Sequence, residues 1–111
     1  MNELVERLSR GEHAVTIGSP QPSVEEFKKR LDEIGYVFIK FTETQGGTNL
    51  GVRLDRAATD LSQADFTRQT GTVHVEGTLT LNYVRVRCLA NIDLATLSGT
   101  GHLVIIEEAT V

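Results

Sequence analysis

Residues 23–55 hold a capped helix, a glycine and two alternating segments, and this unit constrains the fold more than any other part of the sequence. Ser23 and Glu26 have the S-x-x-E spacing of a capping box, so a helix is predicted to begin at about Val24. Gly35 is predicted to end it, because glycine readily adopts the left-handed conformation that terminates helices. One narrow apolar stripe at helical spacing comprises Val24, Phe27, Leu31 and Ile34. The unit therefore predicts an amphipathic helix that packs on a sheet.

The two segments after the helix, 36–42 and 48–55, alternate between apolar and other residues, which is the pattern of β-strands. With Glu43 opposite Thr48, they form an antiparallel hairpin whose apolar side chains share one face. The expected pairs are Phe41 with Leu50, Ile39 with Val52, and Val37 with Leu54. The opposite face is partly apolar through Tyr36 and Phe38. We expect another element or a second subunit to cover part of that face.

The chain before and after this unit is less regular. Residues 2–10 predict a short helix that ends at Gly11, and residues 13–17 predict a strand. The stretch 56–71 has only a weak helix-cap signal. A single helical turn over 63–68 and a mobile loop are the two alternatives there.

The last third of the chain has the alternation of strands. Segments 72–76 and 78–82 are separated by Gly77, which predicts a turn or a bulge. A long strand over 84–92 has an unbroken apolar face made of Val84, Val86, Cys88, Ala90 and Ile92. The final strand, 102–107, is apolar on both faces, so we expect it to be central in the sheet or buried in an interface.

These elements predict an α+β fold. The expected architecture is a mainly antiparallel sheet of five or six strands, with the capped helix packed on one face and a short helix at the N-terminus. The 111 residues are enough for one core, so residues 1–111 are expected to form a single globular domain.

Charge and cysteine content exclude several classes of protein. The 15 acidic and 11 basic residues give a net charge of −4, which argues against general nucleic-acid binding. A lone Cys88 excludes an internal disulfide and suggests a reducing, cytoplasmic setting. No apolar run approaches the ~20 residues of a membrane span, and no basic-then-apolar leader opens the chain. We expect a soluble protein with no membrane association.

A glycine-rich stretch and a histidine–cysteine set are the two motifs with chemical potential. Residues 46–51 superficially resemble a phosphate-binding loop, but a strand rather than a helix is predicted to follow, which favours a hairpin turn. His74, Cys88 and His102 are spaced fourteen residues apart and could meet across antiparallel strands. The close ligand pair typical of zinc sites is missing, and Cys88 is predicted to point into the core, so we assign no metal and no catalytic nucleophile. We also predict no cofactor.

Three arginines form the most suggestive cluster. Arg85 and Arg87 project from one face of one predicted strand, and Arg53 could share that face. Such a cluster can hold a carboxylate or phosphate, or pair with acids of a partner protein. The alternative is an ordinary solvated face on which these arginines pair with acids across strands.

Two classes of function remain. The first is a small soluble, non-catalytic accessory protein that acts through a sheet face or edge, as a homodimer or as a subunit of a larger assembly. The second is a small enzyme or carrier that binds an anionic ligand in a pocket between helix and sheet. We favour the first, because no catalytic motif is recognisable. The residues predicted to bind a partner or ligand are Arg53, Arg85, Arg87, Tyr36, Phe38, His74 and His102.

Overall fold

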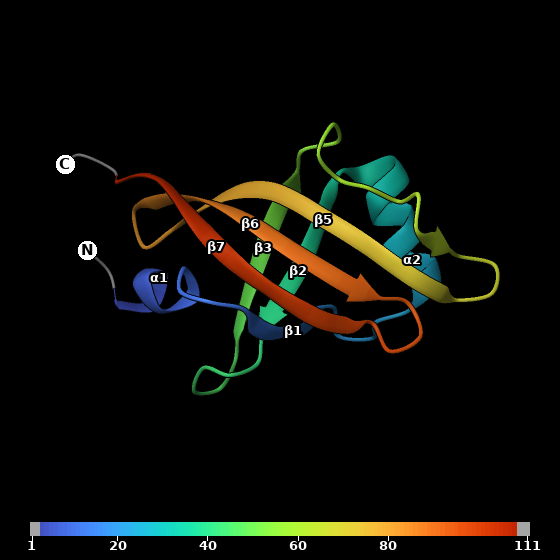
Figure 1. The fold of residues 1–111 in the computed structure, drawn as a ribbon, viewed down its shortest axis with the longest axis horizontal. Coiled ribbons are helices and arrows are strands. Elements are labelled where there is room, and N and C mark those ends of the chain that lie inside the picture. The colour runs from blue at the N-terminus through green and yellow to red at the C-terminus, as the bar shows by residue number, and fades with distance from the viewer. Residues whose placement is uncertain (1–2, 109–111) are drawn as a thin grey trace.

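The structure, a computed structural model, describes residues 3–108 and has the predicted α+β composition. Figure 1 shows long strands crossed by shorter ones, with a helix at each end. The helical elements are α1 (Glu3–Leu8), α2 (Val24–Lys29) and a π-helical turn, η1 (Arg30–Ile34). The strands are β1 (His13–Ile17), β2 (Tyr36–Phe41), β3 (Thr48–Leu54), β4 (Ala64–Asp65), β5 (Thr70–Leu81), β6 (Val84–Asp93) and β7 (Ser98–Glu108).

The sheet is antiparallel, as predicted, but it is closed rather than open. The strand order is β3-β2-β1-β7-β6-β5-β4, and an additional pairing of β3 with β5 joins the two ends. Six strands therefore form a barrel, with β4 appended to β5. Closure is the outcome of strand twist, which turns the edges of a sheet of long strands toward each other. The sequence predicted a mainly antiparallel sheet with a helix on one face, and the closure of that sheet into a barrel was not predicted.

The barrel closes at Gly77, where the sequence predicted a turn or a bulge. Instead β5 runs straight through this residue, and β3 meets β5 in only two pairs, Arg53 with Thr78 and Leu54 with Gly77. A Cβ atom on Gly77 would overlap the carbonyl oxygen of Arg53. The glycine thus permits a close approach of two backbones rather than a change of direction.

The predicted helix cap is confirmed in part. Ser23 Oγ accepts a hydrogen bond from the backbone N–H of Glu26 at 3.1 Å. The Glu26 carboxylate does not return to the cap, and instead accepts from Ser19 Oγ at 2.8 Å and from Arg30 Nε at 3.1 Å. The side chains of Ser19 and Arg30 hold it away from the helix start.

The end of the helix at Gly35 is also confirmed, with a φ of 74°. The Gly35 N–H donates to the carbonyl of Arg30 at 2.7 Å, which is the wider i→i+5 turn of a π-helix. This widening changes the angular position of Ile34, which is 51% exposed although it was predicted to lie on the buried stripe. The other three stripe residues, Val24, Phe27 and Leu31, are buried.

The β2–β3 hairpin has the predicted buried face but a register shifted by two residues. The observed pairs include Ile39 with Leu50 and Val37 with Val52, and Phe41 faces Thr48. Beyond Phe41 the chain turns to β1, because the Thr42 N–H donates to the Ala14 carbonyl at 3.1 Å. The turn is therefore longer than predicted, and Gly46 and Gly47 (φ 72° and 75°) lie in it.

The N-terminal elements match the prediction within the described residues, which exclude Asn2. Val5 and Leu8 of α1 are buried, and Gly11 has a positive φ of 69°. In Figure 1, α1 lies beside the C-terminal part of β7 and α2 lies at the opposite end of the barrel. The two helices therefore cover different ends of the core.

The segment 56–71 is neither a helical turn nor a free loop. Ala64 and Asp65 pair with Gly71 and Thr70, and Asp60 forms an isolated bridge with His74. Together with β3, this segment supplies β5 with neighbours along much of its outer edge. Beyond Thr78, the described residues of β5 have β6 as their single neighbouring strand.

The barrel interior is filled by apolar side chains. The predicted inward set of β6 is confirmed, because all five of its members are at most 5% exposed. β7 begins earlier than predicted and lies between β1 and β6, which confirms its central position. Its outward residues Val104 and Ile106 nevertheless remain 45% and 48% exposed.

Candidate functional site

A groove opens on the outside of the barrel where β3 and β5 separate. Beyond their two shared pairs, residues 48–52 of β3 pair only with β2, and residues 79–81 of β5 pair only with β6. Figure 1 shows the reason: β2 and β3 cross β5, β6 and β7 at a steep angle. The space between the two edges has a volume of about 530 Å³. It is lined by Tyr36, Asn49, Leu50, Gly51, Arg53, Thr78, Leu79, Thr80, Leu81 and Arg85.

The groove combines apolar and cationic side chains. Leu50 is 5% exposed, and Leu79 and Leu81 are half-buried at the edge of the core. Arg53 and Arg85 are exposed, and among the described side chains, which end at Glu107, neither has an ion-pair partner. No acidic residue lines the groove in the part of the chain that the structure describes. Its surface can therefore contact apolar groups and an anion at the same time.

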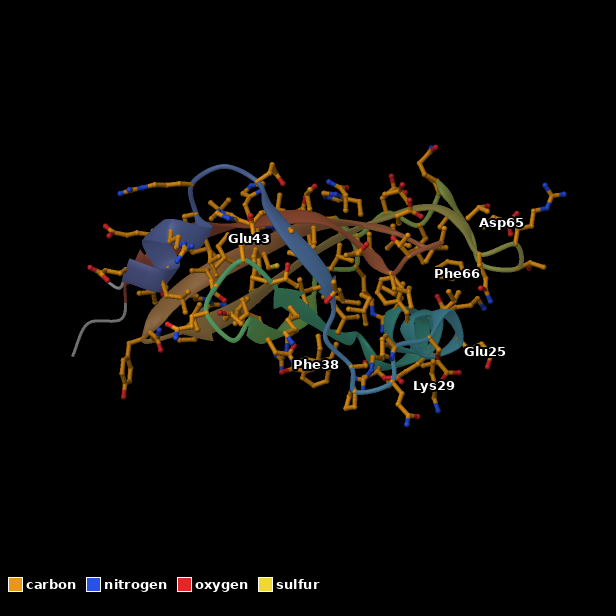
Figure 2. All side chains as sticks on the ribbon, turned by 90° about the horizontal axis from the view of Figure 1, so that it is seen from below. Glu25, Lys29, Phe38, Glu43, Asp65 and Phe66 are labelled. Atoms are coloured by element: carbon orange, nitrogen blue, oxygen red, sulfur yellow. The ribbon has the colours of Figure 1, made fainter. Side chains whose placement is uncertain are left out.

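Tyr36 reaches the groove because Gly51, which pairs with Phe38 and lies diagonally across from Tyr36, has no side chain. A Cβ atom on Gly51 would overlap the Tyr36 hydroxyl oxygen. Tyr36 is 38% exposed, and its ring meets that of Phe38 edge to face at 5.4 Å. Phe38 points outward from β2, as Figure 2 shows, and the Arg30 guanidinium lies 5.1 Å from its ring centre. The η1 turn thus covers part of this face, as predicted.

Arg87 has a different environment, although it lies only two residues from Arg85. Its Nη2 atom is 2.7 Å from Asp55 Oδ2 and 2.8 Å from Glu76 Oε2. These bonds correspond to the alternative considered from the sequence, in which arginines pair with acids across strands. The hydrogen bond from Arg87 holds the pKa of Asp55 below its ordinary value. The predicted cluster is therefore divided: Arg53 and Arg85 line the groove, and Arg87 is neutralised outside it.

His74 extends this network along β5. Its Nδ1 and Nε2 atoms lie 2.8 Å from Asn91 Oδ1 and from Glu76 Oε1, respectively. Partial burial acts to lower the pKa of His74, but hydrogen bonds with Glu76 and Asn91 outweigh it and raise that pKa. The pKa of Glu76 is lowered, mainly by its hydrogen bond with His74 and to a smaller extent by its hydrogen bond with Arg87. His74 is thus part of a polar network rather than of the groove.

The other predicted residues do not join the groove either. His102 Nδ1 is 2.8 Å from Glu12 Oε1, in a geometry that does not make a hydrogen bond. Cys88 is buried inside the barrel, where burial raises the pKa of its thiol to about 12. Because His74 and His102 lie on the outer side, this trio does not converge. In the part of the chain that the structure describes, no group of three or more potential metal ligands occurs.

The groove as a feature, and Leu79, Thr80 and Leu81 as part of it, were not predicted from the sequence. Two signals were present. Gly51 and Gly77 are single glycines inside strands, and such glycines mark places where another group approaches the backbone closely.

A filled barrel with an open cationic groove on its surface defines a small binding protein. The chain matches, over residues 1–111, the family described as core binding factor beta subunit. It belongs to that family. The family is a non-catalytic partner subunit of a larger complex, a heterodimeric transcription factor. No curated protein matches the sequence. Of the helices described, none has the length and apolar character to cross a membrane.

Proposed function

We propose that this chain is a partner subunit that binds another protein through the groove between β3 and β5. The observation that carries the proposal is the pair of strand edges that face the groove. Residues 48–52 and 79–81 each have a neighbouring strand on one side only. Backbone N–H and C=O groups on such edges bind an extended segment of another chain by adding a strand to the sheet.

The side chains around these edges support the same role. Leu50, Leu79 and Leu81 offer apolar contact area, and Tyr36 presents a phenol at one wall. Tyrosine and arginine are the residue types that recur at the centre of protein interfaces. Family membership supports a protein partner independently of the groove.

A second copy of this chain and a small anionic ligand are two other possible binding partners, with less support. Val104 and Ile106 form an exposed apolar pair on β7, which favours self-association as a homodimer. The unpaired Arg53 and Arg85 also suit a small anionic ligand, the alternative considered from the sequence. A light-scattering mass tests the first, and a thermal-shift screen of small anions tests the second. The cytoplasmic setting stays a prediction.

Site-specific photo-crosslinking tests the proposal directly. A photoreactive amino acid replaces Thr80 in the groove, or Thr100 on β7 as a matched control; both are exposed threonines on strands. We expect a covalent adduct with one protein from the native cells at position 80 and none at position 100. Competition by the unmodified chain must abolish the adduct. Equal yields at the two positions would contradict the proposal.

A further inference from the structure

We infer that the partner segment in the groove is acidic and that its carboxylates pair with Arg53 and Arg85. This inference rests on the proposed function and specifies the chemistry of the partner. The groove has two cations and no acid among its lining residues. The chain as a whole has more acidic than basic residues, 15 against 11. The charge of the groove is therefore opposite to that of the protein around it.

Other arginines of the described chain show how this fold usually satisfies a guanidinium. Arg30 pairs with Glu26 at 3.1 Å, and Arg68 lies 3.8 Å from Asp65. Arg56 donates to the carbonyl oxygens of Leu31 and Asp32. Arg7 and Arg10 share a surface hollow with Glu3 and Glu6. Among the described side chains, Arg53 and Arg85 have neither a bonded partner nor an acid in their groove.

Their neighbours in the sheet do not compensate for this. Arg53 is flanked by Tyr36 and Thr78. Arg85 is flanked by Thr80 and by Glu107 of β7, but no ion pair with Glu107 forms. Both guanidinium groups are therefore available to a carboxylate from outside.

The geometry of an added strand predicts the pattern of the partner segment. Side chains of an extended chain alternate between two sides, and those on one side repeat every ~7 Å. A segment paired with either edge can turn apolar residues toward the leucines while alternate residues point outward, toward the arginines. The predicted motif alternates acidic and apolar residues.

A nucleic acid or a free phosphate could also pair with two arginines. The net charge of −4 opposes the approach of a polyanion, and two arginines neutralise few phosphates. An acidic peptide can bind through the two arginines alone, and it can also form backbone hydrogen bonds with the free strand edges. The proposed occupant is therefore a protein segment, and the titrations below also include a nucleic acid and phosphate.

The test is an NMR titration of the full ¹⁵N-labelled chain with two short synthetic peptides. One alternates valine and glutamate, and the other has lysine in place of glutamate. We expect the acidic peptide to shift the amides of residues 49–53 and 78–81, and the lysine peptide to bind at least about tenfold more weakly. Arg53→Gln combined with Arg85→Gln should remove this preference, whereas Arg68→Gln, on a remote exposed arginine, should retain it.

Each other result overturns the inference. If both peptides bind the groove equally, the groove binds segments without regard to charge. If the acidic peptide leaves the groove amides unshifted, an acidic occupant is wrong, and the crosslinking at position 80 decides separately whether the groove binds a protein at all. Stronger binding by a single-stranded oligonucleotide or by inorganic phosphate in parallel titrations would replace the acidic segment with that ligand.

Discussion

Two neighbouring regions on the outside of the barrel give their arginines opposite environments. Arg87 is held by two carboxylates, whereas Arg85, on the same face of β6, has none among the described side chains. The difference follows from the strand beside β5. Next to Arg87, β3 and the loop after it bring Asp55 to the sheet, and next to Arg85 that strand has already turned away. The crossing of β3 and β5 thus separates a self-contained polar network from an open groove.

The largest effect on stability is expected from a side chain placed between β3 and β5 where they cross. Gly77→Val places side-chain atoms where the Arg53 carbonyl oxygen lies, so the two strands must separate. We expect a loss of about 3 kcal/mol in the free energy of unfolding, as for overpacked cores. Urea denaturation measures it. Thr78→Val, the adjacent position with an outward side chain, is the control and should change stability little.

The next largest effect is expected at Arg87, and a comparison with Arg85 tests whether the two arginines contribute differently to stability. Arg87→Gln removes bonds to both Asp55 and Glu76, and we expect the Tm to fall by about 4 °C. Arg85→Gln removes no bond and should leave the Tm unchanged. Differential scanning fluorimetry compares the two variants. Equal changes in Tm would contradict the difference between the two arginines, and an unchanged Tm for Arg87→Gln would show that the network contributes nothing to stability.

A smaller effect concerns pH, because His74 and Glu76 stabilise each other. A raised pKa for His74 means that its contribution is complete below its ordinary value of 6.5 and is lost as pH rises through the higher folded value. A lowered pKa for Glu76 means that its contribution is complete above 4.5 and is lost as pH falls through the lower folded value. The bond should therefore stabilise most between pH 4.5 and 6.5.

Thermal unfolding across this range measures the effect. The difference in Tm between the wild type and Glu76→Gln should be largest inside that window and should shrink above it. A difference that stays constant with pH would show that the two side chains are not coupled.

The smallest effect on stability is expected at Gly51, on the other side of the comparison. Gly51→Ala requires the Tyr36 hydroxyl to move, which an exposed side chain can do at little cost. The Tm should change by less than about 2 °C, while the shape of the groove and its affinity for the acidic peptide change. The same titration detects this. Gly46→Ala in the hairpin turn, outside the groove, is the control for affinity alone, because its φ of 72° makes an alanine there cost stability.

The sequence predicted the parts of the fold that depend on local alternation. The inward face of β6 and the helix limits at Ser23 and Gly35 follow directly from spacing. The β2–β3 register does not follow from spacing, because a shift of two residues leaves the same side chains on the buried face. The hydrogen bond from Thr42 to Ala14 of β1, which sets the register, has no signal in the local sequence. Closure at Gly77 was missed since a single glycine in a strand is compatible with a turn, a bulge or a close approach.

The candidate site was predicted only in its residue types. Arg53, Arg85 and Tyr36 do line one groove, but Arg87 and His74 belong to a separate network. All five lie on outward faces, so alternation could not separate them. What separates them is the point at which β3 leaves β5, and that point is set by tertiary structure.

The short β3–β5 pairing also links recognition to rigidity. A ring joined at one place by two residue pairs opens most easily at that place. A bound segment that adds hydrogen bonds along the adjoining edges lengthens this junction and slows its opening. If the proposed segment binds there, amide hydrogens around Thr78 should exchange more slowly in the complex than in the free protein, because the segment would add a strand at this junction.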